Sequence, residues 1–133
     1  MTLPRREFLI IAGVTLFGRR AGLPLGDSFD QHEHMYGLIG KMTATPGQRD
    51  TLAAILLSGT AAMPGCLSYV VAGDPAEPDA LWITEVWKSA ESHRASLSLP
   101  AVQAAIAQGR PLIAGFSNRT ETSPIGGYGL TGT

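Results

Sequence analysis

The segment from Ile83 to Gln103 constrains the fold of this chain more than any other stretch. It reads ITEVWKSAESHRASLSLPAVQ and joins a run of alternating residues to two short runs of helix formers. Successive residues of a strand point to opposite faces of the sheet. We therefore expect a strand from Leu81 to Trp87, with one face formed by Leu81, Ile83, Glu85 and Trp87.

A short helix is expected directly after this strand. Ser89 can cap its N-terminus, and Glu91 lies in the first turn, where the helix dipole favours an acid. Pro100 breaks the helical run, because the residue before a proline avoids the helical conformation, and a second helical stretch follows. This order brings an acid, an indole and the imidazole of His93 near one small pocket.

The remaining elements are short apolar runs separated by turn residues. The run from Met35 predicts a first strand, and the sequence TPGQ, with Thr45 as the cap, predicts a helix that continues to about Ala62. Further strands are expected over Cys66–Ala72 and Ala114–Glu121. The order β-α-β-β-α-β is the ferredoxin-like arrangement of the α+β class, a four-stranded antiparallel sheet with helices on one face.

We expect one folded domain over residues 35–122, with a leader and linker over residues 1–34 and a Gly-rich tail over residues 123–133. Apolar residues also lie on the sheet face that the helices leave open, and that face needs a cover. A second copy of the chain is the simplest cover, so we expect a homodimer that packs sheet on sheet.

The first residues resemble an export signal. Arg5 and Arg6 precede an apolar run over residues 8–17, which is too short to span a bilayer as an ordinary helix. The string Arg-Arg-x-Phe-Leu resembles the twin-arginine signal, which is read by a translocase of folded proteins. We expect a periplasmic or exported protein without stable membrane insertion; the alternative is a cytoplasmic protein that starts at Met35. A mature N-terminus between residues 22 and 35 in a periplasmic fraction would support export.

Charge and cysteine content exclude several classes of protein. Lys and Arg number 10 against 11 Asp and Glu, scattered without a basic stripe, and this excludes a nucleic-acid partner. Cys66 is the only cysteine, so neither an intramolecular disulfide nor a cysteine-based zinc site can form. No dinucleotide fingerprint or phosphate loop occurs. His32 and His34 alternate with acids and could hold a metal, but linker histidines are more often solvated, and we expect no metal site.

Three stretches carry a resemblance to a known family: PGCLSYVV, the segment ITEVWKSAESHRASLSLPAVQ, and LIAGFSNRTET. The most specific marker is Glu-x-Trp-x-Ser followed by a helix and a Leu-x-x-Pro break, here Glu85, Trp87, Ser89, Leu97 and Pro100. Over residues 35 to about 122 the chain resembles the antibiotic biosynthesis monooxygenase domain family, whose relatives include quinol monooxygenases. The resemblance implies a dimeric α+β barrel, in agreement with the order of elements.

The resemblance also implies an oxygenation that needs no bound flavin or metal, because an electron-rich phenol or quinol is itself the reductant. The protein then binds an aromatic ring, removes a phenolic proton and stabilises the developing oxyanion. We expect a small aromatic or quinol substrate, dioxygen and no cofactor. The alternative is a non-catalytic dimeric module of the same fold that binds a small apolar ligand or protects against a reactive metabolite.

Four residues are candidates for the site. His93 titrates near neutrality when free and is the first candidate for the base, while Glu85 could orient a histidine or take the proton. Trp87 could stack on the substrate ring, and Tyr69 could donate a hydrogen bond to a substrate oxygen. The alternatives are a surface histidine, packing roles for Trp87 and Tyr69, and an ion pair of Glu85 with Lys41 or Arg94.

Two departures from family patterns limit what the resemblance implies. Many relatives carry their histidine where this chain has Ser96, three residues after His93. Haem-degrading members use an Asn, a Trp and a His at positions that correspond here to Lys41, Ser96 and Ile106. Because none of the three matches, we do not expect haem oxygenation.

Overall fold

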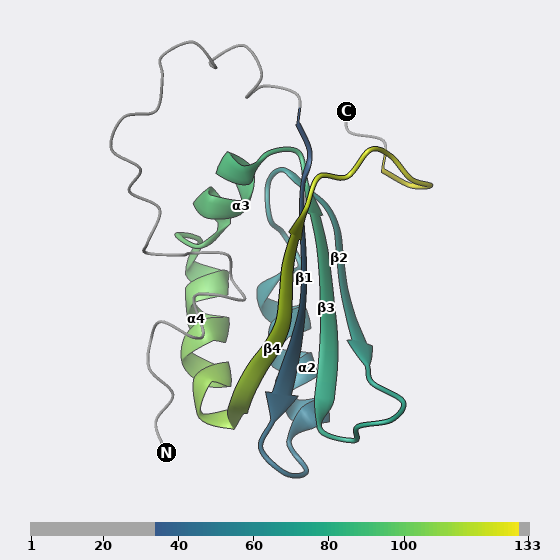
Figure 1. Cartoon of the computed structure of the whole chain (residues 1–133). Helices are drawn as coiled ribbons and strands as arrows, with labels where there is room; N and C mark the ends of the chain where they lie inside the picture. The colour runs from purple at the N-terminus through teal and green to yellow at the C-terminus, as the bar shows by residue number, and fades with distance from the viewer. Residues whose placement is uncertain (1–33, 131–133) are drawn as a thin grey trace, which may run out of the picture.

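The computed structural model describes residues 34–130, and their elements follow the predicted order (Figure 1). The predicted break before Pro100 is confirmed, because one helix ends at Ser96 and the next begins at Pro100. The predicted ferredoxin-like fold is confirmed. In chain order the elements are β1 (Tyr36–Ala44), α2 (Arg49–Gly59), β2 (Cys66–Gly73), β3 (Ala80–Trp87), α3 (Ala90–Ser96), α4 (Pro100–Gly109), the 3-10 helix η2 (Arg110–Leu112) and β4 (Ile113–Thr122).

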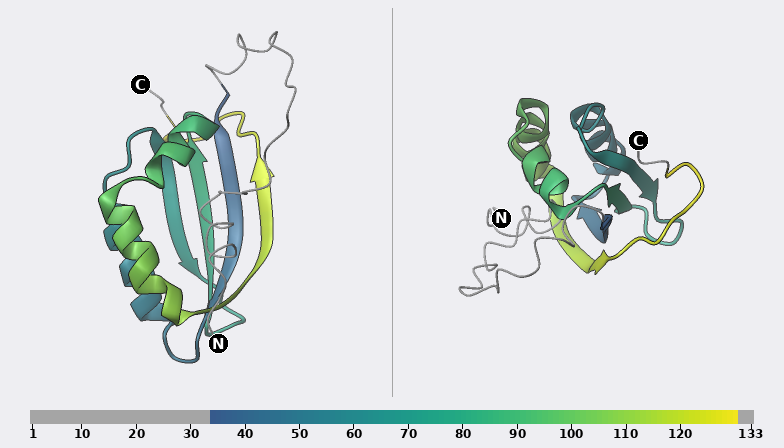
Figure 2. Two further views of the ribbon diagram at one scale, coloured as in Figure 1. Left: turned by 90° about the vertical axis from the view of Figure 1, so that its left-hand side faces the viewer. Right: turned by 90° about the horizontal axis from the view of Figure 1, so that it is seen from above.

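The strands form one four-stranded antiparallel sheet in the order β2-β3-β1-β4. The central pair, β1 and β3, is in register from Tyr36 opposite Trp87 to Thr43 opposite Ala80. The helices α2, α3 and α4 all lie on one face of the sheet, as the two views of Figure 2 show. Within residues 34–130 no helix covers the other face, where the side chain of Val70 stays 50% exposed.

The core lies between the sheet and the helices. The predicted alternation of β3 is confirmed, because the four residues of one face are buried and Trp82, Thr84 and Val86 of the other face are not. A Cβ added to Gly59 in α2 would clash with the Cβ of Ala105 in α4. The glycine therefore lets α2 and α4 approach closely, and the two helices form one layer on the sheet.

The predicted cap of α2 is wrong. The carbonyl oxygen of Thr45 accepts a hydrogen bond from the Gln48 amide at 3.0 Å, and Gln48 is the N-cap residue without a side-chain bond to the helix. Gly47 between them has a φ of +80°, which glycine adopts without strain and which lies outside the helical region. The four residues therefore form a turn, and the helix begins after them and ends at Gly59, earlier than predicted.

The predicted cap of α3 is confirmed. The Ser89 hydroxyl accepts a hydrogen bond from the Ser92 amide at 3.1 Å, which satisfies one of the free donors of the first turn. The chain passes from β3 into this helix through two residues only, Lys88 and Ser89. The short connection holds α3 over the end of β3 that carries Glu85.

The two ends of the chain lie outside the residues that the structure describes. Residues 1–33 and 131–133 include the predicted export signal and His32, so export and the predicted domain bounds stay predictions from the sequence. After β4 the described tail continues to Leu130, with the side chains of Ile125 and Tyr128 fully exposed. Among the helices of residues 34–130, none has both the length and the apolar character needed to cross a membrane.

Candidate active site

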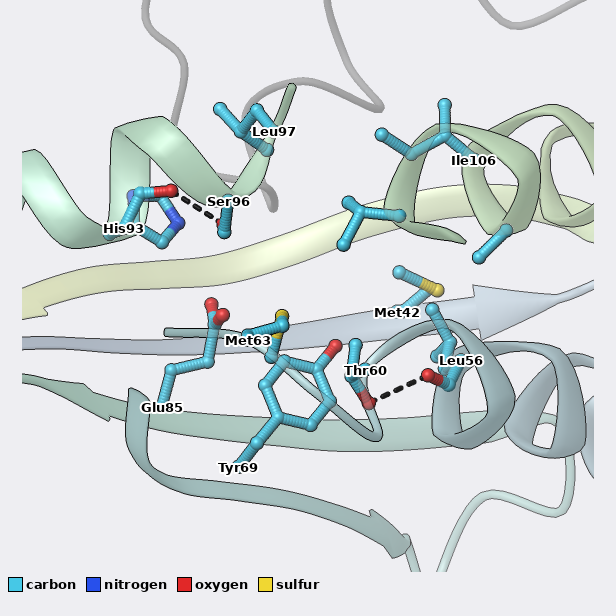
Figure 3. Close-up of a pocket in the computed structure, with 12 residues that line it drawn as sticks. Met42, Leu56, Thr60, Met63, Tyr69, Glu85, His93, Ser96, Leu97 and Ile106 are labelled. Carbon is cyan, nitrogen blue, oxygen red and sulfur yellow. Dashed lines mark hydrogen bonds between the residues drawn. The ribbon is translucent and has the colours of Figure 1, made fainter. Parts of the chain in front are cut away.

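A cavity of about 50 Å³ lies between the sheet and the helices (Figure 3). This volume is several times the roughly 10–15 Å³ that one water molecule requires. The cavity has an apolar end and a polar end, so a bound molecule with one polar edge has a preferred orientation. The apolar end is formed by Met42, Leu56 and Ile106, and the polar end by Glu85, His93 and Ser96, with Tyr69 between the two ends.

His93 points from α3 into the polar end, and only 3% of its surface is exposed. The alternative of a surface histidine is therefore wrong. Its ring packs between two aromatic rings, with centroids 5.2 Å from Tyr36 and 5.3 Å from Trp87, the latter edge-on. Burial, together with the positive charge of Arg119, lowers the pKa of His93 from 6.5 to about 4. The imidazole is thus neutral at physiological pH, with one donor and one acceptor nitrogen.

Ser96 lines the same cavity as His93 and lies one helical turn after it. Residues three apart in a helix share a face, so a histidine at either position of α3 points toward the sheet. The Ser96 hydroxyl donates a hydrogen bond of 2.6 Å to the His93 carbonyl oxygen. The histidine of this chain therefore reaches the cavity from position 93, although many relatives carry theirs at the position of Ser96.

Glu85 enters the cavity from β3, and its carboxyl group points toward α3 and His93 (Figure 3). The residue is 5% exposed. Burial raises the pKa of the Glu85 carboxyl from 4.5 to about 8, against smaller opposing effects of Trp87 and Arg119. The alternative ion pair with Lys41 is wrong, because the Lys41 ammonium lies 2.6 Å from Glu77 and 3.7 Å from Asp74 instead. The other proposed partner, Arg94, is exposed on α3.

Tyr69 reaches the cavity from β2, where it pairs with Glu85 across the two strands. Its hydroxyl group points toward the middle of the cavity, between the polar and the apolar end (Figure 3). Burial and the nearby Glu85 raise the pKa of the Tyr69 hydroxyl well above its ordinary value. Tyr69 therefore stays protonated and can donate a hydrogen bond into the cavity.

Trp87 is fully buried, with 0% of its surface exposed, and is not among the residues that line the cavity. Its indole lies near enough to Glu85 to lower the carboxyl pKa, yet the indole N–H makes no hydrogen bond of regular geometry within the described chain. The edge contact with His93 supports the orientation of the imidazole. This position favours the packing interpretation of Trp87, and stacking on a substrate ring stays a prediction.

Three residues beside His93 were not singled out from the sequence: Tyr36, Arg119 and Glu121. The Glu121 carboxylate accepts a hydrogen bond from the Tyr36 hydroxyl at 3.1 Å and one from Arg119 Nη2 at 2.9 Å. Tyr36 begins β1 and the other two residues lie near the end of β4, so only the pairing of distant strands brings them together. No local motif in the sequence indicates this cluster.

The described residues offer no metal site of the usual kind. Between residues 34 and 130, no group of three or more His, Cys, Asp or Glu side chains lies close enough to hold an ion. Cys66 is half-buried, and its thiol donates a hydrogen bond of 3.5 Å to the Ser68 carbonyl oxygen. Burial raises the pKa of that thiol, so Cys66 is not activated as a nucleophile.

Comparison with known protein families identifies the family to which this chain belongs. The family model of the antibiotic biosynthesis monooxygenases matches residues 35–108, which is more than half of the chain. The chain belongs to this family. The resemblance inferred from Glu85, Trp87 and the break at Pro100 is therefore confirmed. No curated protein matches the chain.

Solved structures of the family share the fold. A protein of Chloroflexus aurantiacus, named as a candidate antibiotic biosynthesis monooxygenase, is 71% identical, with a TM-score of 0.71 over 72% of this chain and 98% of its own. A protein of Caulobacter crescentus with the same designation is 18% identical, with a TM-score of 0.64 over 74% and 96% of the two chains. A Bacteroides thetaiotaomicron protein of unknown function is 17% identical, with a TM-score of 0.60 over 68% and 98%. The last two show the fold alone.

Proposed function

We propose that the chain is a cofactor-independent monooxygenase that oxidises a small quinol or related phenol with dioxygen. The observation that carries the proposal is the cavity between sheet and helices, with an apolar end for a ring and a polar end for its hydroxyl group. In the reaction one oxygen atom is inserted into a ring C–H bond and the other leaves as water. The quinol supplies all four electrons, so quinol and dioxygen give hydroxyquinone and water.

Glu85 is the better matched base for the phenolic proton. A phenol has a pKa of about 10, and the Glu85 carboxyl has a pKa of about 8, whereas His93 has one of about 4. Proton transfer from the phenol to the Glu85 carboxylate is therefore less unfavourable than transfer to His93. A base whose pKa lies near the working pH is also the most efficient. We assign proton abstraction to Glu85.

His93 and Tyr69 then act on the anion. The neutral imidazole of His93 carries one N–H donor, and the protonated side chain of Tyr69 carries one O–H donor. Both donors can point at an oxygen atom of a molecule in the cavity. Donors that are fixed before the reaction stabilise a developing oxyanion without reorganisation. The packing of the His93 ring between Tyr36 and Trp87 supplies this fixed orientation.

Oxygen uptake with reduced menadione tests the proposal. Uncatalysed autoxidation yields the quinone and hydrogen peroxide, whereas the proposed reaction yields the hydroxyquinone and water, so product analysis separates the two. We expect uptake above the blank, and a fall in kcat of about 10²-fold in His93→Ala, the effect of losing one oxyanion donor. Glu91→Gln, an exposed change on the same helix, is the control and should retain activity.

The non-catalytic alternative predicts a different pattern. Menadione itself lacks the electrons for the reaction and reports binding alone. If menadione binds but no quinol of a panel raises oxygen uptake above the blank, the chain is a ligand-binding module and the oxygenase proposal fails.

We also propose that the chain forms a homodimer through the open face of the sheet. Val70 on this face is 50% exposed, and Ile39 and Val86 lie on the same face partly exposed. Apolar side chains that gather on an exposed surface often mark an interaction site. Sedimentation equilibrium should give twice the 14.0 kDa of one chain, or twice the mature mass if the leader is removed. Val70→Lys places a charge in the interface and should shift the mass toward one chain. A single-chain mass for the parent protein would contradict the dimer.

A further inference from the structure

The pairing of β4 with β1 is interrupted by a bulge. Ile39 and Lys41 are two residues apart in β1, yet their partners in β4, Thr120 and Ser117, are three residues apart. One residue of β4 is therefore extra within this stretch. Asn118 lies there with a φ of +54°, the one positive φ of a non-glycine residue in residues 34–130. Asparagine tolerates this left-handed conformation better than most residues.

The bulge decides which residues of β4 face the helices. Phe116 packs against the core, so in a regular strand Asn118 and Thr120 would follow it onto that face. With the extra residue, Glu121 pairs with the buried Leu38 instead, and Arg119 shares its face. Bulges often re-aim side chains next to active sites. This bulge places Arg119 and Glu121 on the helix-facing side of the sheet, beside Tyr36 and outside the residues that line the cavity.

The re-aimed residues form a chain of contacts that ends on the imidazole. Arg119 donates to Glu121, Glu121 accepts from Tyr36, and the Tyr36 ring lies against His93. The Arg119 side chain is 20% exposed, so its charge is only partly screened by solvent. The groups that face His93 are Tyr36 from β1, Glu85 and Trp87 from β3, Arg94 from its own helix, and Arg119 and Glu121 from β4.

We propose that Arg119, held by Glu121 and turned inward by the bulge at Asn118, is a positioning residue for His93 and Glu85 at the polar end of the cavity. Its positive charge disfavours an imidazolium next to it and favours a carboxylate, which lowers the pKa of both groups. His93 is thereby kept as a neutral hydrogen-bonding group, and Glu85 is kept within reach of ionisation. The catalytic consequence rests on the function proposed above, whereas the electrostatic effect on the two side chains does not.

The test is an NMR titration of the free protein, which needs no substrate. In Arg119→Gln the His93 ring signals should titrate at a pH higher by about half a unit or more. The Glu85 carboxyl signal should move in the same direction. Arg119→Lys keeps the charge and should restore most of the parent behaviour. Arg94→Gln removes an exposed cation from α3 and is the control, with a smaller shift because water and salt screen that charge.

Two results would overturn the proposal. One is a His93 titration in Arg119→Gln that matches the parent, and the other is an equal shift in Arg94→Gln. Where quinol oxidation is observed, the midpoint of the kcat–pH profile should also rise in Arg119→Gln with little change in KM, since Arg119 is not among the residues that line the cavity. The titration decides the proposal even if the chain oxidises no quinol.

Discussion

Replacement of Glu85 by glutamine is expected to lower kcat for quinol oxidation by about 10²–10⁴-fold, the usual effect of losing a general base. Glutamine has nearly the same shape but cannot accept the phenolic proton. In the parent protein kcat should rise with pH through about 8, the pKa of the buried carboxyl. The residual activity of Glu85→Gln should lose this rise, while menadione binding should change little.

The same substitution should change how stability depends on pH. The folded pKa of Glu85, about 8, lies above its ordinary 4.5, so its contribution is fully favourable below about 4.5 and is lost as the pH rises through 8. His93 has the opposite sign: its folded pKa of about 4 lies below 6.5, so stability is lost as the pH falls from 6.5 through 4. Between pH 6.5 and pH 8, the change in stability that comes from shifted pKa values in residues 34–130 is therefore due to Glu85.

Urea unfolding at pH values across this range measures the effect. The parent protein should lose stability between about pH 6.5 and pH 8 and then level off, and Glu85→Gln should be nearly flat from pH 6.5 to pH 8. Glu91→Gln, an exposed change, is the matched control and should follow the parent. A parent protein with no slope in this interval would show that the carboxyl is not held protonated by burial, and the assignment of Glu85 as the base would fail with it.

Trp87→Ala is expected to have the largest effect on stability, a loss of about 3–5 kcal/mol, because a fully buried indole is replaced by a cavity. For a domain of this size the loss corresponds to a fall in Tm of more than about 10 °C. Trp87→Phe keeps a ring against His93 and gives up an indole N–H that has no hydrogen bond of regular geometry in the described chain. It should retain most of the stability.

Trp82→Ala provides the comparison on the same strand. Trp82 lies on the opposite face of β3, half-buried, with its indole N–H bonded to Asp74 at 2.8 Å. Its replacement should cost clearly less than that of Trp87. Thermal unfolding followed by circular dichroism would decide, and a Trp87→Ala protein as stable as the parent would contradict the assignment of Trp87 to the core.

The fold could be predicted because local patterns determine most of it. Alternation from Leu81 to Trp87 gave the correct buried face, and Ser89 and Pro100 gave the correct limits of two helices. The start of α2 was missed because a turn, made by a glycine with positive φ, occupies the residues that resemble a cap. Such a turn and a capping box draw on the same residue types, so the sequence alone does not separate them.

The positions of the candidate site residues could be predicted only in part, for a physical reason. Glu85 and His93 are close because one short connection joins their elements, and this closeness is visible in the sequence. Their protonation states are not visible in the sequence, because burial by distant helices and strands raises the pKa of Glu85 and lowers the pKa of His93. Arg119 and Glu121 were missed because strand alternation fails at a bulge, and the bulge depends on pairing with β1.

The fate of the two atoms of dioxygen distinguishes an enzymatic oxygenation from autoxidation. Reduced menadione would be turned over under ¹⁸O₂, and the organic product and hydrogen peroxide would be measured together. We expect one labelled oxygen in a hydroxylated quinone, no peroxide above the blank, and loss of the labelled product in Glu85→Gln but not in Glu91→Gln. An unlabelled quinone with peroxide equal to the oxygen consumed, at the rate of the blank, would contradict it.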